Sequence, residues 1–275
     1  MIKSSPVEID KDVSGLNWEV ADFQELAKIV AVIAVGQVVH AARILDQLEK
    51  NTPAISIPQL NEAACEQLTI KSGLNPEQEK AARAHRDGFL FECISWIATR
   101  QGANDRIFQK DPLISATSQG LDGLVVELEP MKAQIKTVTI CEDKCTDYPR
   151  NKFRDEVMPT FMEHHGNQVR GRELLATAVD IIKSKFSNGT EALIAAQRVM
   201  ELGRRRYRAA LTVDATIDTP EKRAKLFKNY NGLAGIEQSQ RIGATFVMSG
   251  DLRTWFQELA DAVIAAIKSG KVKSV

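Results

Sequence analysis

The sequence predicts an α/β fold in which a mixed sheet is flanked by helices. Helical patterns alternate along the chain with short runs rich in β-branched residues. Two such runs lie close together between residues 121 and 144, and further runs cover 207–213 and 242–248. This alternation is typical of a sheet covered by helices. With 275 residues, of which 44% are hydrophobic, the chain can bury a sizeable core.

The N-terminal part reads as mainly helical. Residues 1–17 are polar and are expected to be extended or loosely packed. A helix is predicted over 18–50, because apolar residues crowd its middle and Pro53 follows its end. A short helical pattern covers 59–68. These patterns predict an N-terminal helical region over residues 1–75.

Residues 76–275 are expected to form the main domain. Pro76 occupies the first position of a helix that continues to about Arg100. Two strands follow, over 121–127 and 138–144, because Gly, Pro and charged residues bound these apolar runs. Further helices and strands are then expected in alternation: a helix from about 152, helices over 173–185 and from 188 to about 203, a strand over 207–213, a helix over 219–230, a strand over 242–248 and a helix over 255–268.

Charged side chains stand at the end of the second predicted strand. Successive side chains of a strand point to opposite faces, so Glu142 and Lys144 share one face and Asp143 takes the other. Asp122 would lie on the neighbouring strand if the two strands form a hairpin. Three polar side chains could then meet at one edge of the sheet. The alternative is a surface strand end whose charges are merely solvated.

Such a group suits metal-assisted phosphodiester chemistry. Magnesium prefers hard oxygen ligands and keeps several waters, so the two carboxylates of Asp122 and Glu142 fit it. The ion would polarise a phosphoryl oxygen and activate a water, and Lys144 could offset the developing charge. Glu92, on the preceding helix, could assist a second ion or a bound water. Its alternative role is that of a surface glutamate.

The net charge gives no general basic field, because Lys plus Arg and Asp plus Glu each number 36. Contacts with nucleic acid must therefore come from local patches. Residues 204–208 form the densest basic run, four arginines (Arg204, Arg205, Arg206 and Arg208) with one aromatic residue, which could either follow phosphates or complement a helix end. Lys152 and Arg154, just after the charged strand, are better placed to hold a scissile strand.

The order of these motifs resembles the PD-(D/E)XK nuclease superfamily. A helix with Glu92 is followed by a strand near Asp122, a strand ending in Glu142-Asp143-Lys144, and another helix. Members share a mixed sheet flanked by helices, so the resemblance implies a restriction-endonuclease-like fold over roughly 78–185, which can include the later strands up to 250.

The resemblance also assigns roles to individual residues. Asp122 matches the metal-binding aspartate, Glu142 the second acidic ligand and Lys144 the signature lysine. Glu92 matches a helix glutamate that occurs in some branches. The chain departs from the name-giving pattern at Leu121, where proline is usual, but many members vary at that position.

The function implied is that of a Mg²⁺- or Mn²⁺-dependent nuclease, an endonuclease acting on DNA. More loosely, the chain is similar to the nuclease subunits of Hachiman anti-phage defence systems, which implies antiviral defence and restraint by a helicase or ATPase partner. The long apolar helix within 18–50 would offer the surface for that partner. The alternative is a non-catalytic nucleic-acid-binding or scaffold subunit that retains the fold.

A cytoplasmic protein without a membrane segment is expected. The N-terminus does not resemble a signal peptide, and the most hydrophobic run, over 29–39, is about half of the roughly 20 residues that a bilayer requires. The four cysteines show no metal-ligand spacing, so reduced thiols are expected.

Overall fold

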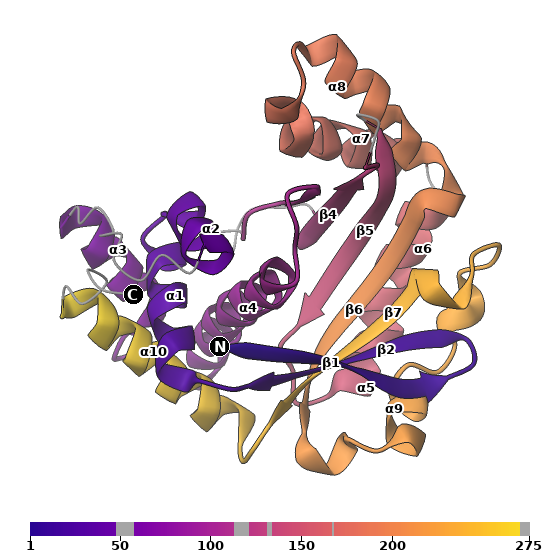
Figure 1. Ribbon diagram of the computed structural model, residues 1–275. Coiled ribbons are helices and arrows are strands. Elements are labelled where there is room, and N and C mark those ends of the chain that lie inside the picture. The colour runs from indigo at the N-terminus through magenta and orange to yellow at the C-terminus, as the bar shows by residue number, and fades with distance from the viewer. Residues whose placement is uncertain (48–57, 113–120, 131–133, 167, 270–275) are drawn as a thin grey trace.

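A mixed sheet in the order β1-β2-β7-β6-β5-β4-β3 runs through the molecule (Figure 1). The structure is a computed structural model, and it describes residues 1–47, 58–112, 121–130, 134–166 and 168–269. The strands of this part of the chain are β1 (Ile2–Asp10), β2 (Val13–Val20), β3 (Ile107–Gln109), β4 (Gly123–Leu128), β5 (Ile135–Lys144), β6 (Arg205–Asp214) and β7 (Arg241–Met248). Strands β2, β7, β6 and β5 are parallel, whereas β1, β4 and β3 join by antiparallel pairing.

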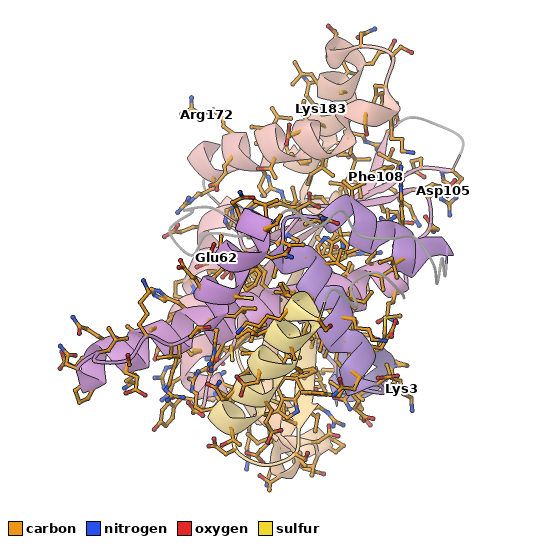
Figure 2. The ribbon with its side chains drawn as sticks, turned by 90° about the vertical axis from the view of Figure 1, so that its left-hand side faces the viewer. Lys3, Glu62, Asp105, Phe108, Arg172 and Lys183 are labelled. Carbon is orange, nitrogen blue, oxygen red and sulfur yellow. The ribbon has the colours of Figure 1, made fainter. Side chains whose placement is uncertain are left out.

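Helices cover both faces of this sheet. Their bounds are α1 (Phe23–Ala34), α2 (Val38–Gln47), α3 (Pro58–Leu68), α4 (Pro76–Gln101), α5 (Pro149–Lys152), α6 (Met158–Gly166), α7 (Gln168–Ile182), α8 (Gly189–Ala196), α9 (Pro220–Leu226) and α10 (Leu252–Lys268). Helices α1 to α4 and α10 lie on one side, which faces the viewer in Figure 2. Helices α6, α7, α8 and α9 contribute to a second core on the other side. The expected α/β class is therefore confirmed.

Helix α4 is the long element of the first layer. It begins at Asn75, whose side chain accepts from the backbone N–H of Gln78 while the Gln78 side chain accepts from the N–H of Asn75. This reciprocal cap satisfies two backbone donors that a helix start would otherwise leave open. The second half of α4 is buried, with Leu90 and Ile94 at 0% exposure. This burial fixes the position, relative to the sheet, of the polar residues Glu92, Ser95 and Thr99 on the same helix.

The N-terminal residues differ from the expected loose segment followed by one long helix. Ile2–Asp10 and Val13–Val20 form a hairpin, and β2 pairs with β7 in the same sheet as β5. Strand β1 is an edge strand with mostly exposed or half-exposed side chains, so its apolar alternation is weak. The prediction of an N-terminal helical region over residues 1–75 was wrong for this segment. Because β1 and β2 belong to the same sheet as the later strands, the predicted boundary at residue 75 does not divide the fold.

The predicted helix over 18–50 is also divided. Residues up to Val20 belong to β2, and Gly36 adopts a positive φ of 81° between α1 and α2. Glycine occupies that region at little cost, so it ends the first helix cleanly. The end expected near Lys50 lies outside the described residues. None of the described helices is long and apolar enough to cross a membrane.

Candidate active site

The β4–β5 hairpin forms the framework of the site. Gly123 at the start of β4 pairs with Cys141 in β5, which places Asp122 beside the last residues of β5. A side chain on Gly123 would meet the Cβ of Cys141 at 3.2 Å. The small residue therefore lets the two strands approach closely at this end. The sequence expectation of a hairpin in this region is confirmed.

Asp122, Glu142 and Lys144 meet at the open end of the hairpin. The Nζ atom of Lys144 lies 2.7 Å from Oδ2 of Asp122 and 3.0 Å from Oε2 of Glu142. The backbone N–H of Asp143 also donates to Oδ2 of Asp122, at 3.3 Å. One ammonium thus holds two carboxylates together, and the backbone of β5 fixes one of them.

Burial and neighbouring charges shift the pKa values of Glu142 and Lys144. The Glu142 side chain is only 5% exposed. Burial first, and then the negative charge of Asp122, raise the pKa of Glu142 to about 8, although Lys144 opposes this rise. Burial by itself would lower the pKa of Lys144, but the charges of Glu142 and Asp122 and their hydrogen bonds raise it above its usual value. The lysine is therefore firmly cationic, and a further cation would relieve the repulsion between the carboxylates.

Asp143 points to the opposite face of β5, as strand alternation predicts. Its Oδ1 atom lies 3.6 Å from Nη2 of the buried Arg208. Arg208 donates to Oγ of Ser95 at 2.6 Å and to Oγ1 of Thr99 at 2.5 Å, both on α4. Its guanidinium also lies 5.2 Å from the ring centroid of Trp18 in β2. Arg208 therefore ties together β2, α4, β6 and the end of β5.

A small cavity of about 20 Å³ lies between α4 and the β4–β5 hairpin. Glu92 lines it together with Asp122 and Asp143. The structure therefore brings the predicted helix glutamate to the cavity that Asp122 also lines, on the sheet face opposite Glu142 and Lys144. Four buried atoms of this lining have no hydrogen-bond partner: Trp96 Nε1, Arg208 Nε, Gln109 Oε1 and Asp143 Oδ1. Two donors and two acceptors complement one water molecule, and the volume suits one.

A second buried charge network braces the chain just after the site. Asp87 on α4 is 0% exposed. Its Oδ1 accepts from Nε of Arg86 at 3.0 Å, and its Oδ2 accepts from Nη1 of Arg253 on α10 at 2.7 Å. Arg253 also donates to Oδ2 of Asp147, which follows β5. Helices α4 and α10 thereby hold the segment that leaves the site.

The donor set fits a magnesium ion. Asp122 and Glu142 supply two carboxylates, and Mg²⁺ typically uses one or two carboxylates together with water and substrate oxygens. No group of three or more His, Cys, Asp or Glu side chains that could hold a metal ion occurs in the described part of the chain. An all-protein cage of the type used by structural zinc or calcium is therefore not formed by these residues.

Lys152 and Arg154 lie where they were expected, shortly after β5, on α5 and on the π-helical turn Phe153–Val157. Lys152 pairs with Glu156, and Arg154 pairs with Asp155. All four side chains are well exposed, so these surface pairs can open at little cost. Their contact with nucleic acid stays a prediction.

The arginine run at the start of β6 has a mainly structural setting. Arg205 is 4% exposed and donates to the carbonyl oxygens of Val199 and His164. The expectation that Arg205 contacts phosphates was wrong, because its guanidinium is enclosed by the protein. Arg204 is bound to Glu201 and Glu129.

Arg204 and Arg206 are also remote from the carboxylates. Arg205 pairs with Val138, whereas Leu211, six residues further along β6 (211 − 205), pairs with Lys144. At a rise of about 3.3 Å per residue, the run begins roughly 20 Å from Lys144 along the strand. Phosphate contact by Arg204 and Arg206 stays a prediction, but not at the site itself.

The hydrogen bonds that Arg208 makes with Ser95 and Thr99 on α4 were not predicted from the sequence. Ser95 and Thr99 follow Glu92 at intervals of three and seven residues (95 − 92 and 99 − 92), which places all three on one stripe of α4. Arg208 stands in β6 between Tyr207 and the apolar residues 209–211. A polar stripe on a buried helix and a charge inside a buried strand are the signals that could have indicated this network.

Comparisons with protein-family models, with characterised proteins and with solved structures found no match to this chain.

Proposed function

We propose that the chain is a metal-dependent nuclease that hydrolyses phosphodiester bonds of DNA. The observation that carries the proposal is the convergence of Asp122, Glu142 and Lys144 at the end of the β4–β5 hairpin, with ion-pair distances of 2.7 and 3.0 Å. The order α4, β3, β4, β5, helices, β6 agrees with the fold that the PD-(D/E)XK resemblance implies.

Each residue has a distinct part in the proposed reaction. Asp122 and Glu142 would hold the Mg²⁺ or Mn²⁺ ion, which supplies polarisation of the phosphoryl oxygen and activation of a water when bound. Lys144 orients the attacking water and offsets negative charge that develops on the phosphate. The backbone N–H of Asp143 keeps Asp122 in place. Glu92, across the neighbouring cavity, would assist from the α4 side.

DNA cleavage tests this proposal directly. Purified protein is incubated with plasmid and with linear DNA in Mg²⁺ or Mn²⁺, with and without chelator. We expect cleavage that chelator abolishes and that Lys144→Ala lowers by at least about 100-fold, because a preorganised charge at the phosphate is removed. Asp122→Asn should weaken metal binding as well as the rate.

Lys136→Ala provides a matched control. Lys136 lies on the same strand and pairs with Glu127 at 2.7 Å, near the other end of the hairpin. Its variant removes one lysine from β5 without touching the site and should cleave at the wild-type rate. Cleavage by Lys144→Ala at the wild-type rate would contradict the proposal. DNA binding without any cleavage would favour the non-catalytic alternative.

The proposal extends to an effector of anti-phage defence that a helicase-type partner restrains. Its support is the looser resemblance and the zero net charge, which makes unaided capture of DNA weak. The apolar segment that was expected to receive the partner does not support it, because residues 29–33 of α1 are 0% exposed within the chain's own core. Co-expression with the neighbouring reading frame, followed by affinity purification and size-exclusion chromatography, tests it. A chain that runs alone after this co-expression, with no helicase-type partner in its fraction, would contradict it.

A further inference from the structure

A groove of about 310 Å³ lies between α5 and α9, shortly after the charged end of β5. Three cationic side chains line it, Arg150, Lys222 and Lys225, and no carboxylate does. Its apolar wall includes Ile217 and Leu226. A groove that combines cations with apolar surface differs from the evenly mixed charges of an ordinary protein surface.

Tyr148 stands at the rim of this groove with 70% of its surface exposed. Large aromatic side chains are commonly half-buried or more, so such exposure leaves a free ring face. Its position is set by the backbone, since its N–H donates to Oγ1 of Thr146 at 3.0 Å and Pro149 begins α5 directly after it. The ring is therefore presented by a fixed segment.

Two of the groove cations are anchored by backbone carbonyl oxygens, and none of the three forms a salt bridge with a described residue, although Asp214 and Glu221 interact electrostatically with Lys222 and Lys225. Arg150 donates to the carbonyl oxygens of Leu226 and Lys228, which joins α5 to α9. Lys222 donates to the carbonyl oxygen of Thr216. Asp155 and Asp218 are paired elsewhere, with Arg154 and Arg223. Arg150 and Lys222 thus line the groove beside an exposed aromatic ring without a salt bridge to any described carboxylate.

The groove also lies on the correct side of the sheet. Glu142 and Lys144 alternate with Asp143, which faces α4, so they lie on the face that carries the core around Phe153, beside α5. Tyr148 follows Lys144 by four residues (148 − 144), so the two Cα atoms are at most about 14 Å apart. A nucleic-acid strand that crosses the site can therefore reach the groove within a few nucleotides.

We propose that this groove binds single-stranded nucleic acid, with Tyr148 stacking on an unpaired base and Arg150, Lys222 and Lys225 contacting its phosphates. The inference deepens the proposed function, on which it rests, by naming the substrate as a single strand or a frayed end. Stacking requires a base whose face is free, and duplex bases already stack on each other. Aromatic residues beside a basic groove are the usual means of holding a single strand without reading its sequence.

Fluorescence anisotropy with labelled oligonucleotides tests the groove, in chelator so that cleavage cannot interfere. The probes are a single strand, the matching duplex and the same single strand carrying abasic positions. We expect Tyr148→Ala to weaken single-strand binding by roughly 5- to 100-fold and to leave duplex binding nearly unchanged. Tyr148→Phe keeps the ring and should bind like the wild type. Abasic positions should remove the difference between the Tyr148→Ala variant and the wild type.

The cations are tested by the salt dependence of the same binding. Lys222→Ala/Lys225→Ala should reduce the slope of log K against log salt by about 1.4, since each phosphate contact to a single strand contributes about 0.7. Arg172→Ala/Lys183→Ala serves as the charge-matched control. Both residues are exposed on or just after α7, and Figure 2 shows them far from the lower end of the molecule where α5 and α9 lie in Figure 1. That variant should keep the wild-type slope.

These outcomes separate the groove from the proposed chemistry. An equal loss of single-strand and duplex binding in Tyr148→Ala, no loss at all, or no binding of any probe by the wild type would overturn the inference. If Tyr148 controls binding but the wild type cuts no DNA in Mg²⁺ or Mn²⁺, the nuclease proposal fails and the groove remains. If DNA is cut while Tyr148→Ala binds single strands like the wild type, the groove inference fails and the nuclease proposal remains.

Discussion

The two faces of strand β5 carry polar residues in very different settings. On one face, Glu142 and Lys144 meet Asp122; the Glu142 side chain is only 5% exposed, whereas the lysine and the aspartate remain 23% and 29% exposed. On the other face, Asp143 is enclosed with Arg208, Ser95 and the rest of α4. Neighbouring residues of one strand therefore have different roles. The first face is accessible at Lys144 and Asp122 and brings two carboxylates close together, whereas the second is enclosed and fixes the backbone that presents the first.

The comparison predicts that damage to the enclosed face appears mainly as lost stability. Arg208→Met removes the partner of buried Asp143 and the cross-links to Ser95 and Thr99. Because one member of a buried charge network is left unpaired, the free energy of unfolding should fall by about 3–5 kcal/mol. Urea denaturation followed by circular dichroism measures it. A loss below about 1 kcal/mol would show that Arg208 does not brace the sheet.

On the face of Glu142 and Lys144, a substitution should instead raise the free energy of unfolding, by an amount that depends on pH. Burial and the charge of Asp122 raise the pKa of Glu142 from 4.5 to about 8. The stability linked to its protonation is therefore fully present below about pH 4.5 and is lost as the pH rises through 8. Glutamine cannot ionise, so in chelator Glu142→Gln should exceed the wild type above pH 8 by on the order of a few kcal/mol.

Urea denaturation at several pH values checks this prediction. The difference between Glu142→Gln and the wild type should grow from pH 4.5 to 8 and then level off. A difference that is constant with pH would mean that ionisation of Glu142 does not lower the free energy of unfolding. Tolerance of such a cost is common where a residue serves activity rather than stability.

A milder change on the enclosed face refines the comparison. Ser95→Ala removes the hydroxyl that accepts from Nη2 of Arg208 at 2.6 Å, while the guanidinium keeps its bond to Thr99. The free energy of unfolding should fall by about 1–3 kcal/mol, the range for a hydrogen bond to a charged group. Its DNA cleavage, measured per folded molecule, should stay close to that of the wild type. A large loss of cleavage in a stable Ser95→Ala protein would break the division between the faces.

The parts of this arrangement that depend on local geometry could be read from the sequence. Alternation along a strand requires no tertiary information, so the separation of Glu142 and Lys144 from Asp143 was predicted correctly. The approach of Asp122 followed from a hairpin between adjacent strands. These residues are close in sequence, and their short connection leaves few other arrangements.

The parts that depend on distant contacts could not be read in this way. Arg208 contacts Ser95 and Trp18, which are distant in the sequence, whereas the basic run that contains it was interpreted as a possible phosphate-binding patch. Arg205 is buried because backbone carbonyls of Val199 and His164 receive its hydrogen bonds. The β1–β2 hairpin was missed because an exposed edge strand lacks a clear apolar alternation. Sequence pattern alone does not distinguish these cases from solvated charges and loose termini.

DNA cleavage by Glu142→Gln and Asp143→Asn, compared per folded molecule in Mg²⁺ or Mn²⁺, tests the account most directly. The two substitutions remove one carboxylate charge each from adjacent positions on opposite faces of β5. We predict that Glu142→Gln lowers the rate by at least about 100-fold, whereas Asp143→Asn stays within about tenfold of the wild type. Equal losses in the two variants, or a larger loss in Asp143→Asn, would contradict the assignment of chemistry to the face shared by Glu142 and Lys144.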